Sequence, residues 1–218
     1  MLSLLIKVIP LDLASTLSPG IFALAVVILG GKWHSKARTS ALFLGVLIVG
    51  IAVTVLGFSL GKNVAGNIGG TLSSAIVDLI LGAVFIVFGI KSLFSKEREI
   101  KQPQTDPGYQ IFKWLIIGII ISATNLDAVF LNFAAAKEVG GSIGIREITK
   151  VILLAVNVFF FTLPVTLPLF FYFIAPKTAK NILENINHFV LKYNKTIMFI
   201  LFMIFGVLLT YRGLIYFI

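Results

Sequence analysis

Three aspartates lie within long apolar stretches of the chain, where ionisable side chains are rare. Asp12, Asp78 and Asp127 are three of its nine acidic residues. A charge in the hydrocarbon of a membrane costs several kcal/mol, so an intramembrane aspartate usually has a function. Asp12 and Asp78 lie near the ends of their stretches, where a carboxylate can instead reach water or cap a helix. Asp127 lies near the middle of its stretch and is the strongest of the three candidates.

Polar and helix-breaking residues interrupt two of the stretches. The first contains Ser18-Pro19-Gly20, and a later one contains Thr124-Asn125 shortly before Asp127. Proline lacks the backbone N–H and glycine tolerates unusual dihedrals, so the first interruption predicts a broken helix. Backbone groups freed at a break bond to water, side chains or a substrate. The simpler alternative is a kink in which the Ser18 hydroxyl binds a freed carbonyl.

Helical spacing places further polar residues on common faces with these breaks. Asp12, Ser15, Thr16 and Pro19 share one face, and Asn125 and Asn132 share another. A further stretch carries Asn157 ahead of two prolines, Pro164 and Pro168, which can bend a helix. We therefore predict a polar path through an apolar bundle. The predicted substrate-binding residues are Asp12, Ser15, Ser18, Pro19, Gly20, Asp78, Thr124, Asn125, Asp127 and Asn157.

The composition requires that lipid solvates most of these stretches. Of 218 residues, 58% are hydrophobic and 12% are charged, with a mean hydropathy of +1.04. The apolar runs are too long and continuous for barrel strands, whereas a helix satisfies its own backbone within each span. We predict an all-α integral membrane protein with six transmembrane helices, near Leu2–Leu29, Ala41–Leu60, Leu72–Phe94, Ile111–Ala136, Val151–Ile174 and Thr196–Phe217.

A polar linker at 95–110 divides the chain into two halves of three spans, 1–94 and 111–218. An odd number of spans in each half predicts two inverted repeats, in which spans 1 and 4 are interrupted and their breaks meet near the midplane. Apolar residues at Ile182, Ile186, Phe189 and Val190 also predict an interfacial amphipathic helix near 176–194.

The basic residues predict the orientation. Of the 18 lysines and arginines, twelve lie in or beside the loops that follow spans 1, 3 and 5. The other six lie on the opposite side. Because cytoplasmic loops collect lysine and arginine, we expect a plasma-membrane protein with both termini outside.

Several functional classes are disfavoured. The chain has no cysteine, which excludes disulfides and thiolate metal sites. Its net charge of +9 comes from residues at the ends of apolar runs, so topology explains it and no nucleic-acid partner is expected. The two histidines, His34 and His188, are predicted outside the spans, and no Ser/His/Asp spacing is present. We therefore expect neither an enzyme nor a cofactor.

Small residues form smooth ridges on two predicted spans. Gly50, Thr54, Gly57 and Gly61 share one face of the second span, and Gly82 and Gly89 lie seven apart in the third. Such ridges let helices pack closely in lipid, where hydrophobicity does not drive association. We interpret them as packing surfaces, either inside one chain or between two copies in a homodimer.

The segment from Leu13 to Gly20, LASTLSPG, with the apolar run to Lys32, resembles the opening of lysine-exporter superfamily proteins. It is most similar to their peptidoglycolipid-addressing (Sap) group. The segment from Gly118 to Asn125, GIIISATN, leading into Phe133-Ala134-Ala135-Ala136, is similar to the second half of that group.

The resemblance implies a six-span exporter of amino acids, other small solutes or lipid-linked molecules, with Ser18, Pro19, Gly20 and Asn125 in the substrate path. The chain departs from the family pattern where Leu126-Asp127 stands in place of a common Pro-Lys. An acidic residue there leaves the substrate charge open and favours a cationic solute or proton coupling.

Two functions therefore stand ahead of the others. The first is a secondary transporter that exports a small solute or a lipid-linked molecule through a midplane site. The second is a lipid-handling factor, either scramblase-like or a subunit of a lipid export system. Membrane lipids are partners in both.

Overall fold

The computed structural model of the protein describes residues 1–30, 35–65, 72–94, 111–174 and 176–217, with only the backbone described at some positions, chiefly in 176–194. Within these ranges every element is an α-helix. The linker at 95–110 and His34 lie outside the described residues, as does the side chain of His188.

The six apolar runs correspond to four single helices and two broken ones. The single helices are α3 (Ser35–Ala65), α4 (Leu72–Phe94), α7 (Glu147–Ile174) and α8 (Pro176–Ile215). The broken ones are α1 (Leu2–Ser15) with α2 (Pro19–Leu29), bent by 49°, and α5 (Ile111–Ala123) with α6 (Leu126–Gly140), bent by 73°. Among the described residues, four helices are long and apolar enough to cross a membrane, or up to six if each bent pair is one span. The prediction that spans 1 and 4 are interrupted is confirmed.

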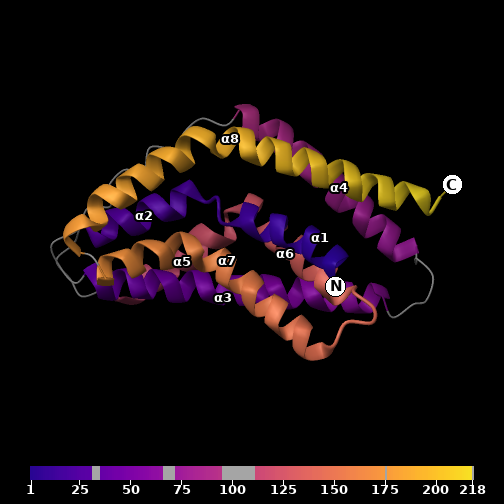
Figure 1. The fold of residues 1–218 in the computed structure, drawn as a ribbon, viewed down its shortest axis with the longest axis horizontal. Helices are drawn as coiled ribbons and strands as arrows, with labels where there is room; N and C mark the ends of the chain where they lie inside the picture. The colour runs from indigo at the N-terminus through magenta and orange to yellow at the C-terminus, as the bar shows by residue number, and fades with distance from the viewer. Residues whose placement is uncertain (31–34, 66–71, 95–110, 175, 218) are drawn as a thin grey trace.

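Several helices extend beyond their apolar runs. α3 begins at Ser35 and α7 at Glu147, each several residues before its apolar run. A helix can continue into polar residues because its hydrogen bonds are made by the backbone. Residues 176–194 are helical as predicted, but they form the first part of the 40-residue α8 rather than a separate helix. Figure 1 shows that α8 changes direction partway along its length.

The helices pack in pairs that join distant parts of the sequence. α4 packs mainly on α8, and α3 packs on both α5 and α6 (Figure 1). The glycine ridges lie in these contacts: a Cβ on Gly57 would lie 2.5 Å from the Phe133 carbonyl oxygen of α6, and one on Gly89 would lie 3.3 Å from Met203 of α8. The interpretation of these glycines as packing surfaces within one chain agrees with these contacts.

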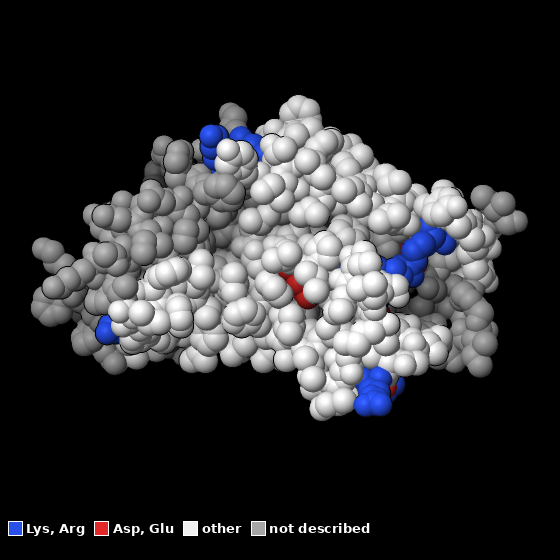
Figure 2. All heavy atoms as spheres, viewed as in Figure 1, with Lys and Arg blue, Asp and Glu red and all other residues white. Residues whose placement is uncertain are grey.

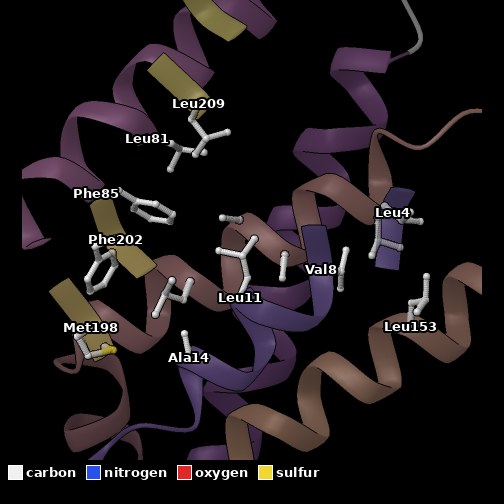
Figure 3. Close-up of a cluster of buried hydrophobic side chains, with 14 residues drawn as sticks. Leu4, Val8, Leu11, Ala14, Leu81, Phe85, Leu153, Met198, Phe202 and Leu209 are labelled. Atoms are coloured by element: carbon white, nitrogen blue, oxygen red, sulfur yellow. The ribbon is translucent and has the colours of Figure 1, made fainter. Parts of the chain in front are cut away.

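Two large apolar clusters fill most of the interior, and a smaller one contains Phe22 and Leu183. One joins α1, α4, α6 and α8, and Figure 3 shows Leu4, Val8, Leu11 and Ala14 of α1 among side chains from α4, α7 and α8. The other joins α2 and α5 to the first part of α3 and the later part of α7, around Ala25, Leu42 and Val165. The two broken helix pairs run from one cluster into the other, so their breaks lie between the clusters.

The outer surface suits a lipid environment. Many large apolar side chains are exposed, including Leu56, Ile80, Ile152 and Val207. Figure 2 shows that the visible lysines and arginines lie toward the edges of one face, while its middle is almost free of charge. So many exposed large apolar side chains are unusual for a water-soluble monomer.

Candidate functional site

The first break forms where Pro19 cannot continue the hydrogen bonding of α1. Ser18 donates its N–H to the Thr16 carbonyl over 2.8 Å, and Pro19 then begins α2. The Ser15 hydroxyl donates to the Asp12 carbonyl over 2.7 Å, and the Thr16 hydroxyl donates to the Leu13 carbonyl over 2.7 Å. The carbonyls of the last turn of α1 are thus satisfied by neighbouring side chains, which makes the break tolerable in lipid.

The second break has the same design without a proline. The Thr124 hydroxyl donates to the Ile120 carbonyl over 2.8 Å, and Asn125 donates its N–H to the Ser122 carbonyl over 3.2 Å. Asn125 is then the N-cap of α6. Threonine and asparagine are weak helix formers because their side chains compete for backbone hydrogen bonds.

The two breaks meet in the structure. The Asn125 side-chain amide donates to the Ser18 hydroxyl over 2.6 Å, although the two residues are 107 positions apart. Ser18 is almost fully buried, at 4% exposure. The two interruptions therefore form one location between the first and second halves of the chain.

A second group of polar side chains lies deeper, and we call Asp12, Thr54, Asn132 and Asn157 the interior network. Asn157 donates its amide N–H to Asp12 Oδ1 over 2.6 Å. Asn132 donates its amide N–H to Asn157 Oδ1 over 2.9 Å. The Thr54 hydroxyl lies 2.6 Å from Asn157 Oδ1 and 3.1 Å from Asn132 Oδ1. Each member comes from a different helix, namely α1, α3, α6 and α7.

One atom of this network lacks a partner. Asp12 Oδ2 is buried and forms no hydrogen bond, while the Asp12 side chain is fully buried. No ion pair of Asp12 occurs among the described residues. A buried carboxylate without a neutralising partner is costly, so this atom calls for a ligand or a proton.

A third polar group lies at one end of the molecule, and we call Lys7, Asp78, Lys137, Glu138 and Arg212 the end cluster. Lys137 forms a buried ion pair with Asp78, and Arg212 donates to Glu138 over 2.8 Å. Arg212 also lies 3.6 Å from Asp78, and Lys7 lies 3.6 Å from Glu138. Because Lys7 is near the N-terminus and Arg212 near the C-terminus, both termini lie at this end.

The predicted residues divide among these three locations. Ser18 and Asn125 form the contact of the breaks, Asp12 and Asn157 belong to the interior network, and Asp78 belongs to the end cluster. Asp12 is therefore fully buried rather than near water, and Asp78 is held by basic partners.

The remaining predicted residues lie at the periphery of the breaks. Ser15 is buried beside Asp12, Pro19 is half-buried, and Gly20 is exposed with open space around its α-carbon. Thr124 is exposed and bonds to its own helix. Asp127 lies half-buried in the first turn of α6, with no hydrogen bond or ion pair to any described residue. The most deeply buried aspartate of the described residues is thus Asp12, whereas Asp127 lies in the first turn of α6.

Sequence reasoning left Thr54 out of the predicted site, and it placed Asn132 on the polar path without counting it among the substrate-binding residues. Thr54 belongs to the glycine ridge and was assigned to packing, yet its hydroxyl points into the interior network. Asn132 shares a face with Asn125 but lies in an alanine-rich segment without a break. A signal was present for both, since a polar side chain in the middle of a span needs a partner.

The described residues contain no group of three or more histidines, aspartates or glutamates that could hold a metal ion. The possible ligands in the interior are thus amide and hydroxyl oxygens around a single carboxylate. This arrangement offers hydrogen-bond donors and acceptors around one carboxylate.

Comparison with known proteins identifies one similarity. A family model described as "Sap, sulfolipid-1-addressing protein" matches residues 8–215, which is nearly the whole chain. No curated protein and no solved structure matches this chain. The match agrees with the group predicted from LASTLSPG and GIIISATN, while membership of the wider lysine-exporter superfamily stays a prediction.

Proposed function

Because this chain belongs to the Sap, sulfolipid-1-addressing protein family, we propose that it is a membrane carrier that exports a small solute or a lipid-linked molecule. The contact between Ser18 and Asn125 carries the proposal, because it joins two broken helices in the interior of an apolar bundle. A helix broken inside a membrane exposes backbone groups only where they line a path or a binding site.

The substrate would bind where α2 and α6 begin. Neither Ser18 nor Asn125 forms a side-chain cap on its own helix, because the two side chains bond to each other. The first backbone N–H groups of the two helices therefore have no side-chain cap. A polar group of the substrate would replace the Ser18–Asn125 bond and bind these N–H groups.

We further propose that residues 1–94 and 111–218 are inverted repeats. Corresponding helices support this arrangement: each half begins with a broken span, and the third helices of the halves, α4 and α8, pack on each other. In such a protein one half rocks against the other around the central site.

The end cluster would act as a closed gate in this motion. Its ion pairs join α1 and α4 of the first half to α6 and α8 of the second. The side chains of Lys7 and Arg212 are 49% and 42% exposed. Ion pairs that are partly exposed in this way exchange readily with water. Opening would separate these pairs and admit water to the break contact from the end where the termini lie.

The absence of cysteine makes a direct test simple, because single-cysteine variants need no altered background. Ser18→Cys and Asn125→Cys would be labelled with a membrane-impermeant thiol reagent in vesicles of both orientations. A carrier exposes its central site to each side in turn, so both variants should react from both sides. Phe85→Cys, in the core of the α4–α8 side, is the matched buried control and should stay unlabelled. Unreactive Ser18→Cys and Asn125→Cys would refute the carrier.

Flux provides the second arm of the test. A fluorescent sulfated glycolipid would be reconstituted with the protein in liposomes, and its movement between leaflets followed by chemical quenching. Asn125→Ala should abolish gradient-driven movement, whereas Asn63→Ala, at the exposed end of α3, should leave it intact. Asp127→Asn tests the remaining acidic candidate in the same assay.

The family description favours a second candidate, a lipid-handling factor of the scramblase type. The flux assay separates the two. A scramblase equilibrates the glycolipid between leaflets without any ion gradient, whereas a secondary carrier accumulates it on one side only while a gradient is present.

A further inference from the structure

We propose that the interior network binds one monovalent metal cation, Na⁺, at the Asp12 carboxylate. The starting observation is that Asp12 Oδ2 is fully buried without a hydrogen-bond partner, while Oδ1 accepts from Asn157 alone. An isolated charge in such a place is unstable unless a positive partner is present. The ion pairs of the described residues lie elsewhere, chiefly in the end cluster, so no lysine or arginine among them serves as that partner.

Some oxygens of the network are left without a donor, as the ligand oxygens of a cation site are. Thr54 has one hydroxyl hydrogen but lies within 3.1 Å of two amide oxygens, those of Asn132 and Asn157. Only one of these oxygens can accept it. Together with Asp12 Oδ2, at least two buried oxygens are left with free acceptor capacity, and a hard cation is the ligand that such oxygens favour.

The charge of the site selects a monovalent ion. Asp12 is the one carboxylate of the network, and no group of three or more acidic or histidine side chains occurs among the described residues. A divalent ion would leave an uncompensated positive charge among apolar side chains, whereas Na⁺ with Asp12 is neutral. A half-turn of the Asn157 amide would replace its N–H with its oxygen beside Asp12 and add a further ligand.

The position of the site links ion binding to the broken helices. Its four side chains come from α1, α3, α6 and α7, so a bound ion would hold both halves of the chain together. Asp12 precedes the break of α1 by less than two helical turns, and Asn132 follows the break of α6 by about two. A role in coupling would rest on the proposed carrier function, but binding itself would not.

Binding is tested on the purified full-length protein in detergent, without any transport. Thermal unfolding would be followed in NaCl, KCl and choline chloride at equal ionic strength. We expect a saturable rise in Tm with Na⁺ of about 5 °C relative to choline at saturation. An equal Tm in Na⁺ and choline would overturn the proposal, and stability that responds to pH but not to Na⁺ would identify a proton as the partner of Asp12 instead.

Variants locate the effect. Asp12→Asn keeps the shape of the side chain and removes its charge, so the Na⁺-dependent shift should disappear. Thr54→Val should raise the Na⁺ concentration at half-maximal shift about tenfold. Thr162→Val is the matched control, because Thr162 is also buried but donates to the Phe159 carbonyl of its own helix. Retention of the full shift in Asp12→Asn would place the ion elsewhere and overturn the proposal.

If Asp12→Asn does not fold, the wild-type comparison of Na⁺ with choline and the Thr54→Val titration still decide the matter. Failure of the carrier is distinguished by the thiol-labelling and flux assays. A Na⁺-dependent Tm in a protein without flux would leave the ion site in place and remove only its coupling role.

Discussion

The interior network and the end cluster are both groups of polar side chains around buried carboxylates, but they are built from opposite components. The interior network surrounds one carboxylate with two amides and a hydroxyl, and that carboxylate has no ionic partner. The end cluster pairs two carboxylates with three cations. The interior can therefore accept an added positive charge, whereas the end cluster is held together by charges that it already contains.

This contrast has a physical origin in access to water. Lys7 and Arg212 are about half exposed, so the end cluster borders the water outside the bundle and can hydrate when its pairs separate. Asp12, Asn132 and Asn157 are fully buried between two apolar clusters. Neutral amides are the less costly way to place hydrogen-bonding groups at such a depth.

The largest expected effect is in the buried pair of the end cluster. Lys137→Met leaves Asp78 buried without its closest cation, since both side chains are 5% exposed. We expect a loss of about 3–5 kcal/mol in the free energy of unfolding. The measurement is chemical unfolding of the purified protein in detergent. The double variant Asp78→Leu with Lys137→Met should recover most of this loss, and no recovery would show that the pair is not the cause.

The interior network should respond in the opposite way to loss of its charge. Asn157→Leu removes the donor to Asp12 and should cost about 1.5–3 kcal/mol, because a hydrogen bond to a charged group is lost. Asp12→Asn, which removes the charge itself, should cost less than about 1 kcal/mol in Na⁺-free buffer or even stabilise the protein. The same unfolding assay compares them, and a larger cost for Asp12→Asn would contradict the contrast drawn between the two regions.

The seam between α3 and α6 joins the two regions, and its packing can be tested separately from its polar groups. Gly57→Ala would place a Cβ 2.5 Å from the Phe133 carbonyl oxygen, and backbone cannot move aside cheaply. We expect a loss of about 1–3 kcal/mol. Gly30→Ala is the control, because the nearest atom to its Cβ would be the Val26 carbonyl oxygen at 3.5 Å. Equal stabilities of the two variants, measured by thermal unfolding, would show that the seam is not tightly packed.

The smallest expected effect is at the exposed edge of the end cluster. Lys7→Ala removes a 3.6 Å ion pair whose lysine is 49% exposed, so it should cost about 0–1 kcal/mol. Raising the KCl concentration should erase even this difference, since exposed charges are screened. A cost that persists at high KCl would mean that Lys7 is more deeply engaged than its exposure indicates. The readout is the unfolding midpoint of both proteins across a KCl series.

Much of the architecture could be predicted from local sequence. Continuous apolar runs predicted the spans, and α4 was predicted at its observed bounds, Leu72–Phe94. The breaks were predicted as well, because Pro19 cannot donate a backbone hydrogen bond and Thr124-Asn125 disfavour a helix. The interfacial helix was harder, because nothing in 176–194 signals whether a helix stops before the following span or continues into it.

The sequence predicted most of the polar residues of the site, but not which of them contact one another. Asp127 was expected to be central because it lies in the middle of an apolar run, yet a break two residues earlier places it in the first turn of a new helix. Thr54 was expected only to pack, because small residues on one face are consistent with both packing and hydrogen bonding. Partners separated by a hundred positions, such as Ser18 and Asn125, were proposed only through the likeness of the two halves.

The sequence alone therefore determined that this protein spans a membrane with helices and that two of its spans are broken, since hydropathy and loss of a backbone donor are properties of short segments. Only the tertiary structure decided that Asp12 is fully buried without an ion-pair partner among the described residues, and that Asp78 is held by Lys137. Those outcomes depend on how each helix is rotated about its axis against its neighbours, and close contacts between distant segments determine that rotation.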